Sequence, residues 1–167
     1  MLKPIDLTQL KINPFTLIGK EWMLVTAGDE RKYNMMTASW GGIGVMWGKN
    51  VSITVIRPQR YTLEFVDEKE YYSLSFFDEK DKPALNYCGS HSGREVNKET
   101  ETGLTPVFDA EAPYFSQAKL VLICRKLHKQ KLDPSGFIDK TIDAQWYPQK
   151  DYHECFVGEI VGVLMND

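Results

Sequence analysis

The sequence predicts a mainly β protein, an antiparallel barrel of Greek-key-like topology with a few short helices on its outside. About seven short segments are apolar or alternate between apolar and polar residues, and Gly, Pro and Asp clusters separate them, which is typical of strands. The few segments with helical spacing do not alternate with these strands, which excludes a βαβ repeat. With 167 residues, 43% of them hydrophobic, the chain is long enough for one domain over residues 1–167.

The first part of the chain predicts an arm followed by a β-hairpin. Pro4 and Pro14 mark the first 15 residues as an arm that lies over the domain. Residues 22–26 form a short apolar run, and residues 34–40 alternate between the two sides of a strand. The polar residues 28–32 lie between them, so the two strands are expected to pair through a turn.

The pattern in the middle of the chain predicts a strand, a short helix, a second strand and a second helix, in that order. Residues 51–57 alternate cleanly and form a strand. Thr62 is expected to be the N-cap of the short helix that follows. Residues 71–77 form another strand, with its aromatic and leucine side chains inward. Asp78 is then the expected N-cap of a helix that extends to about Cys88.

The last third of the chain closes the barrel. Residues 100–117 contain Gly and Pro breaks and are expected to be irregular, with a small strand at most. Residues 119–125 form a strand buried on both faces. Residues 126–150 are polar and rich in lysine, so they predict a projecting excursion. Residues 156–165 form the final strand, with glycines where a barrel strand bends.

Composition narrows the possible functions. The net charge of −3 provides no electrostatic footprint for nucleic acid, and the longest apolar run, residues 120–124, is too short to cross a bilayer. The N-terminus lacks the apolar region of a signal peptide. Three cysteines and three histidines without metal-ligand spacing predict no metal site. We therefore expect a cytoplasmic protein with neither a membrane nor a nucleic acid as partner.

Residues 34–47 combine small polar side chains, two tryptophans and three glycines, a mixture that a core strand does not need. Thr37 and Ser39 point to one side of the predicted strand, and Trp40 points to the other. The glycines then permit a sharp turn or a close backbone approach. Two interpretations fit this stretch, namely a half-exposed strand entering a turn, and the wall of a site for a flat, partly polar ligand.

Two further segments place cations where helices begin. Arg60, Tyr61 and Thr62 open a helix whose unpaired N–H groups attract an anion such as phosphate. The loop at residues 90–98 leads into a helical turn that carries Lys98. In an acidic chain these cations form a local positive minority, although each one taken singly also fits a solvated surface charge or a plain helix cap.

Four motifs in order resemble the flavin reductase-like family, and within it the flavoredoxin branch. The motifs are Asn34-x-Met36-Thr37-x-Ser39-Trp40-Gly41, Arg57-Pro58-x-Arg60-Tyr61-Thr62, Ser90-x-Ser92-Gly93-Arg94-x-x-x-Lys98 and His153-x-x-Phe156-Val157-Gly158-Glu159. The resemblance covers roughly residues 12–165. It implies an FMN-binding split barrel, FMN as cofactor, and a homodimer with the flavin near the subunit interface.

The resemblance also assigns roles to residues. It implies that the flavin ring lies against the first motif, and that the phosphate and ribityl oxygens lie against the other cations and hydroxyls. The implied cofactor-binding residues are Asn34, Met36, Thr37, Ser39, Trp40, Arg57, Arg60, Tyr61, Thr62, Ser92, Gly93, Arg94 and Lys98. His153 is the implied catalytic residue beside the open ring face, and its other interpretation is a partly buried strand histidine.

Three functional hypotheses follow from this resemblance. The first is an FMN-dependent oxidoreductase that takes a hydride from NAD(P)H and passes electrons to a small molecule or protein. The second is a flavoredoxin-type electron-transfer protein without NAD(P)H activity, and the third is a barrel that has lost its flavin. The sequence ends at Asp167, where the family usually continues, and residues 126–150 are longer than the usual connection. Both differences are expected near the approach of the second substrate.

Overall fold

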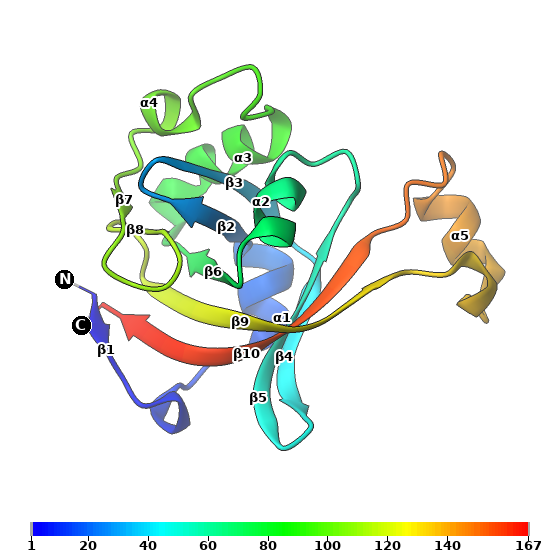
Figure 1. Ribbon diagram of the computed structural model, residues 1–167, viewed down its shortest axis with the longest axis horizontal. Coiled ribbons are helices and arrows are strands. Elements are labelled where there is room, and N and C mark those ends of the chain that lie inside the picture. Colours follow the sequence, from blue (N-terminus) through cyan, green and yellow to red (C-terminus); the bar gives the residue numbers. More distant parts are fainter. Residues whose placement is uncertain (1, 167) are drawn as a thin grey trace.

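A computed structural model describes residues 2–166 of the chain, and it is dominated by one antiparallel sheet (Figure 1). The strands are β1 (Lys3–Pro4), β2 (Met23–Asp29), β3 (Lys32–Ala38), β4 (Gly41–Met46), β5 (Lys49–Ile56), β6 (Tyr71–Phe76), β7 (Pro106–Val107), β8 (Tyr114–Phe115), β9 (Leu120–Lys131) and β10 (Glu154–Met165). The main sheet has the order β3-β2-β6-β9-β10-β5-β4, with β1 paired to β10. The predicted mainly β fold is confirmed.

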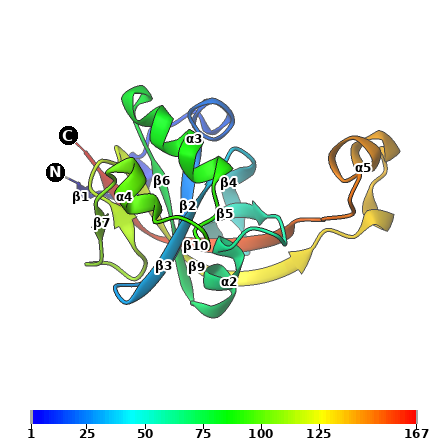
Figure 2. The ribbon, with the colours of Figure 1, turned by 90° about the horizontal axis from the view of Figure 1, so that it is seen from above.

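Short helices lie around the sheet, as predicted. They are α1 (Pro14–Thr16), α2 (Thr62–Glu68), α3 (Lys82–Ser90), α4 (Lys98–Thr102) and α5 (Lys140–Trp146). Helix α3 packs on β3, and α2 packs on β2 and β3, so both helices cover the same end of the sheet (Figure 2). This packing places the first residues of α2 and the last residues of α3 beside β3, the strand that contains Asn34.

The β9–β10 pair bends at the glycines of β10. The register shifts between Val157 and Gly158, and again between Ile160 and Gly162. A Cβ on Gly158 would lie 2.4 Å from the hydroxyl oxygen of Tyr72, so any side chain at this position would overlap the tyrosine. Phe156 and Tyr72 are fully buried beside this bend. The glycines of the final strand therefore have the bending role that the sequence predicts.

The glycines after Trp40 form strand β4, and of the two expected alternatives Gly41 shows the close approach, since a Cβ there would lie 2.4 Å from the Ile53 carbonyl oxygen. Two expected helix caps were wrong in detail. Thr62 is the first residue inside α2, and the N-cap is Tyr61 without a side-chain bond. Asp78 also makes no capping bond, since a 3₁₀ turn separates it from α3.

The excursion at residues 126–150 is partly strand. Strand β9 runs on to Lys131, where it still pairs with Glu154 of β10. Beyond it the chain forms a 3₁₀ turn at Pro134–Gly136 and then α5. We call residues 132–153 the α5 arm. The arm stands clear of the helices around β2 and β3, at the far end of the long strands (Figures 1 and 2).

The described part of the chain shows neither a membrane-spanning helix nor a cluster of metal ligands. Within residues 2–166, no helix combines the length and apolarity needed to cross a membrane. The same part of the chain contains no group of three or more His, Cys, Asp or Glu side chains arranged for a metal ion.

Candidate functional site

Two adjoining hollows lie where β3, β5, α2 and α3 meet. The first, the aromatic hollow, has a volume of about 240 Å³ and is lined by Met36, Thr37, Ala38, Ser39, Trp40, Val55, Arg57, Arg60, Gly89, Trp146 and His153. The second, the cationic hollow, has about 170 Å³ and is lined by Asn34, Met36, Gln59, Arg60, Tyr61, Thr62, Ser90, His91, Ser92, Gly93 and Lys98. Met36 and Arg60 belong to both, so the hollows are continuous.

Strand β3 brings Met36, Thr37 and Ala38 to the aromatic hollow, and α3 approaches the strand very closely there. The hydroxyl of Thr37 donates to the carbonyl of Leu85 in α3. A Cβ on Gly89 would lie 3.3 Å from the Cβ of Thr37, so a small residue is needed at that contact. Met36 and Ala38 are buried, and β3 ends at Ala38, which leaves Ser39 and Trp40 in the connection to β4.

Aromatic side chains form one wall of the aromatic hollow. The rings of Trp40 and Trp146 meet edge to face, with centroids 4.9 Å apart and an interplanar angle of 84°. The ring of His153 lies 5.3 Å from that of Trp40. Such a wall is suited to a flat ligand, because ring faces and edges pack well against an aromatic system.

His153 is a neutral imidazole in this wall at neutral pH. It is only 7% exposed, and its Nδ1 lies 2.8 Å from the hydroxyl oxygen of Tyr147. Burial, and then the nearby Arg57 guanidinium, lowers the pKa of His153 to about 4. If Nδ1 accepts the Tyr147 hydroxyl proton, Nε2 is the N–H donor of the ring. His153 can then orient a ligand through one hydrogen bond, but it carries no charge there.

The cationic hollow contains two cations without acidic partners, the buried Lys98 and the half-buried Arg60. The Arg60 Nη1 donates to the carbonyl of Gly89 at 2.7 Å. The Lys98 ammonium, in a residue only 4% exposed, donates to the carbonyls of Met35 and Cys88, each at 2.8 Å. Across residues 2–166, neither cation forms an ion pair with a carboxylate. Their charge is therefore available to an anionic ligand.

The end of α3 explains how these cations are tolerated. Cys88 and Gly89 lie in the last turn of α3, where carbonyls lack partners within the helix and the helix dipole is negative. Burial nevertheless lowers the pKa of both cations, that of Lys98 to about 8. An anion bound between them would favour the charged form of each. The arrangement is suited to a phosphate group.

The loop before α4 is held against β3 by a contact that requires glycine. Asn34 is 5% exposed, and its Nδ2 donates to the Thr62 hydroxyl at 2.8 Å. A Cβ on Gly93 would lie 2.0 Å from the Asn34 Oδ1, so any side chain at this position would displace the asparagine. This contact joins the first, second and third motifs of the sequence at one point.

Two of the cations in the motifs are already paired. Arg94 forms an ion pair with Glu64 and lies over the Tyr61 ring, 4.4 Å from its centroid. Arg57 lines the aromatic hollow, but its Nη1 lies 2.6 Å from the Asp151 carboxylate and its Nη2 donates to the Trp146 carbonyl at 2.9 Å. The structure thus brings 13 of the 14 implied site residues to the two hollows, and Arg94 lies outside them.

A third, larger hollow lies beside the cationic hollow. This outer hollow of about 420 Å³ shares Asn34, Gly93 and Lys98 with it, and extends over Arg31, Lys32, Arg94 and neighbouring residues.

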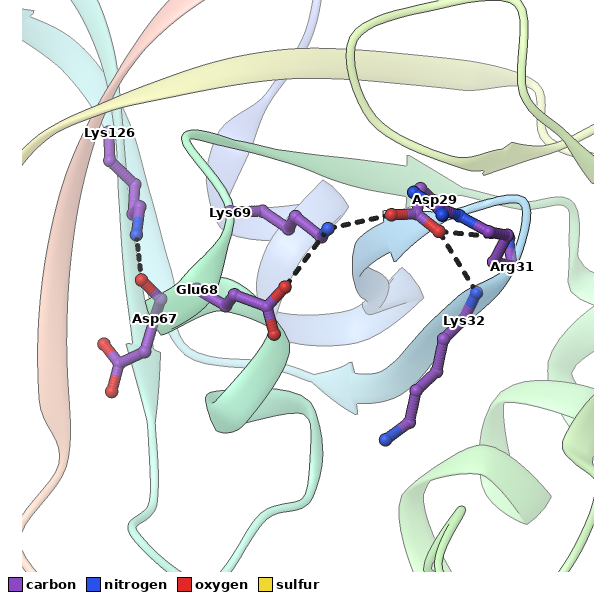
Figure 3. Close-up of polar contacts among 7 residues, drawn as sticks. All are labelled: Asp29, Arg31, Lys32, Asp67, Glu68, Lys69 and Lys126. Atoms are coloured by element: carbon purple, nitrogen blue, oxygen red, sulfur yellow. Dashed lines mark hydrogen bonds and ion pairs between the residues drawn. The ribbon is translucent and has the colours of Figure 1, made fainter.

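The turn between β2 and β3 is fixed by Asp29, next to this outer hollow. Its carboxylate accepts the backbone N–H groups of Arg31 and Lys32 and the Lys69 ammonium, which also lies 3.2 Å from Glu68 (Figure 3). The Lys69 bond is the main cause that lowers the pKa of Asp29 to about 2. The Lys32 ammonium points away from this network (Figure 3), and it lies 5.5 Å from the Phe65 ring centroid. The fixed turn sets the start of β3.

Some lining residues were missed by the sequence analysis. Trp146 comes from α5, inside the segment treated as a polar excursion, and a lone tryptophan among polar residues was the available signal. Gly89 lines the aromatic hollow because of its position in α3, and Gln59 lines the cationic hollow. Nothing in their local sequence distinguishes Gly89 and Gln59.

Solved structures share this fold. The FMN-binding domain of a flavin reductases-like enzyme from Shewanella baltica is 16% identical, with a TM-score of 0.70 over 99% of this chain and 77% of that chain. Flavoredoxin of Desulfovibrio vulgaris (Miyazaki F) is 21% identical, with a TM-score of 0.67 over 98% and 76%. A structure from Shewanella frigidimarina described as having a split barrel domain is 18% identical, with a TM-score of 0.69 over 96% and 77%.

These likenesses confirm the predicted split barrel, and they include the flavoredoxins that the motifs resemble. No curated protein sequence matches the chain. The family model described as a flavin reductase like domain matches residues 16–167, nearly the whole chain. The chain therefore belongs to the flavin reductase-like family.

Proposed function

We propose that the protein is an FMN-binding oxidoreductase that uses NAD(P)H as its electron donor. The observation that carries the proposal is a continuous pair of hollows with an aromatic wall at one end and two unneutralised cations, Arg60 and Lys98, at the other. A flavin mononucleotide has the same polarity, with a flat ring at one end and a phosphate at the other. When bound, FMN accepts a hydride from the nicotinamide of NAD(P)H and delivers two electrons to an acceptor.

The chain's own residues have distinct parts in this proposal. Met36, Thr37, Ser39 and Trp40 pack around the ring, and Arg60 with Lys98 holds the phosphate. Lys98 also donates to the Met35 carbonyl in the middle of β3, next to Met36, so it can bring positive charge toward the ring. A cation there would stabilise the reduced, anionic form of the cofactor. His153 supplies at most a hydrogen bond, because its imidazole is neutral.

The choice of FMN over FAD depends on the outer hollow. FMN ends in the phosphate, which the cationic hollow suits. The adenylate of FAD would have to continue past Lys98 into the outer hollow, which has the volume for it. We propose FMN because Arg60 and Lys98 lie together at the phosphate end. The NADH:FAD oxidoreductase of Streptomyces globisporus is 15% identical to this chain over 87% of its length, with a TM-score of 0.65. Because that protein is described with FAD, the test must include both flavins.

A homodimer is part of the same proposal. The β4–β5 hairpin ends in exposed apolar side chains, with Val45 74% and Trp47 58% exposed, and Ile53 of β5 and Val161 of β10 are also exposed. Exposed apolar side chains on paired strands support burial against a second subunit. Sedimentation of the FMN-loaded protein as a monomer would contradict this part.

The experiment uses the visible spectrum of purified protein reconstituted with FMN or FAD. We expect tight uptake of FMN and bleaching by NADH or NADPH under anaerobic conditions. FMN that is reduced by dithionite but by neither nicotinamide would instead support the flavoredoxin-type alternative. Trp146 favours that alternative, because its indole packs on Trp40 in the wall of the aromatic hollow and takes up space beside the proposed ring site. Failure to bind either flavin would support a barrel that has lost its cofactor.

A further inference from the structure

Trp146 reaches the aromatic hollow from outside the barrel. It is the last residue of α5, and its ring meets Trp40, which lies between β3 and β4. Trp146 is 44% exposed, whereas His153 on the same wall is 7% exposed. Among the described residues, Trp40 is the one ring partner of Trp146. One side of the hollow is therefore closed by a side chain that is held by a single aromatic contact.

The size of the hollow makes this closure important. At about 240 Å³ the aromatic hollow is smaller than the roughly 300–1,000 Å³ typical of a pocket for a whole ligand. A volume of this size accommodates about one flat ring system, and a second ring stacked on the first would need space beyond it. A nicotinamide must stack on the flavin ring to transfer a hydride. A donor that approaches the ring past Trp146 therefore needs that indole to move.

Most of the wall is fixed. His153 is buried and bonded to Tyr147, and Arg57 is bonded to Asp151. The Trp146 backbone is also fixed, because its carbonyl accepts from Arg57 at 2.9 Å. Its side chain is different, since α5 has no buried residue and the indole borders solvent. Of these three side chains, the Trp146 indole is the one that can turn away without breaking a hydrogen bond or an ion pair that the described residues form.

We propose that Trp146 is a gate that determines which electron donors reach the flavin ring, an inference that rests on the proposed function. In the closed arrangement the indole packs on Trp40 and excludes a stacked nicotinamide. In the open arrangement it turns into solvent, while Arg57 holds the arm in place. An edge-to-face pair of this kind favours the closed state by about 2- to 10-fold. The apparent affinity for the donor is reduced by the same factor.

The test compares Trp146→Ala with Ile138→Ala in the FMN-loaded protein. Ile138 lies on the same arm and is 98% exposed, so its truncation is a matched control. The first measurement is quenching of bound flavin fluorescence by iodide, which reports access to the ring without turnover. The second is the steady-state rate with NADH and NADPH. For Trp146→Ala we expect quenching constants to rise and KM for the donor to fall by about 2- to 10-fold, with kcat nearly unchanged.

Each outcome is decisive. Unchanged quenching in Trp146→Ala would overturn the gate, and so would a raised KM, since the indole would then be part of the donor's binding surface. If neither nicotinamide reduces the wild-type protein, increased quenching with gained reduction in the variant supports the gate. Increased quenching without any reduction refutes its role in donor choice. Failure of the wild-type protein to bind FMN would refute the proposed function itself. The visible spectrum of the wild-type protein reveals that outcome independently of the variants.

Discussion

Replacing Arg60 by alanine tests the phosphate end of the proposed site. Arg60 lines both hollows, and within residues 2–166 its guanidinium has one hydrogen-bond partner, the Gly89 carbonyl. A charged hydrogen bond to a ligand phosphate contributes about 1.5–3 kcal/mol. We therefore expect Arg60→Ala to weaken FMN binding by about 10- to 150-fold.

The assay titrates apoprotein with FMN and with riboflavin, and follows quenching of flavin fluorescence. Riboflavin has the same ring and ribityl chain but no phosphate, so its affinity should change by less than about threefold in Arg60→Ala. Arg125→Ala is the matched control, because Arg125 is a cation of β9 that lies 2.7 Å from Glu159 and lines neither hollow. It should leave both affinities unchanged.

The variant should also change its neighbour. The charge of Arg60 is one of the causes that lower the pKa of Lys98, so its removal should raise that pKa. Equal losses for FMN and riboflavin would show that Arg60 acts on the ring or on the fold. Unchanged affinity for FMN would remove Arg60 from the phosphate site. A urea unfolding curve for the apoprotein separates these results from a loss of stability.

Three further predictions concern the residues around the hollows. FMN affinity should fall above about pH 8, where Lys98 loses its proton, and Lys98→Met should bind FMN more weakly without this pH dependence. Gly93→Ala should lose about 1–3 kcal/mol of unfolding free energy in urea, because its Cβ would overlap the Asn34 Oδ1, whereas Gly136→Ala, with open space around it, should change little. His153 has a folded pKa near 4, below its ordinary value of 6.5, so the unfolded state binds more protons between these values. The neutral His153 therefore contributes about 1–2 kcal/mol to the free energy of unfolding, after allowance for solvent screening. This contribution is fully present above pH 6.5 and is lost as the pH falls toward 4. In urea unfolding between pH 4 and 7, His153→Gln should lack this part of the pH dependence.

The strands could be predicted from the sequence because their patterns are local. Alternation over residues 51–57 and 71–77 corresponds to β5 and β6, since a half-buried strand imposes a period of two. The glycines of β4 left two alternatives open for a physical reason. A glycine permits both a turn and a close approach of two strands, and the Ile53 carbonyl that distinguishes these cases is far away in the sequence.

The candidate site was less accessible to local reasoning. The cations of the motifs could be named, but their partners could not, because an ion pair such as Arg94 with Glu64 joins segments that only the fold brings together. Trp146 was missed for the same reason. Its place in the wall depends on the length of β9 and β10 and on the bond from Arg57, and no pattern around residue 146 expresses either.

The use of helix carbonyls instead of carboxylates explains how Arg60 and Lys98 remain available to a ligand. A buried cation needs partners, since unpaired burial costs several kcal/mol. A carboxylate would satisfy that need but would also cancel the charge that a phosphate requires. The Cys88 and Gly89 carbonyls each accept one hydrogen bond, from Lys98 and from Arg60 respectively, and they leave a net positive charge in the hollow. The lowered pKa of both cations is the remaining cost, and a bound phosphate would offset it.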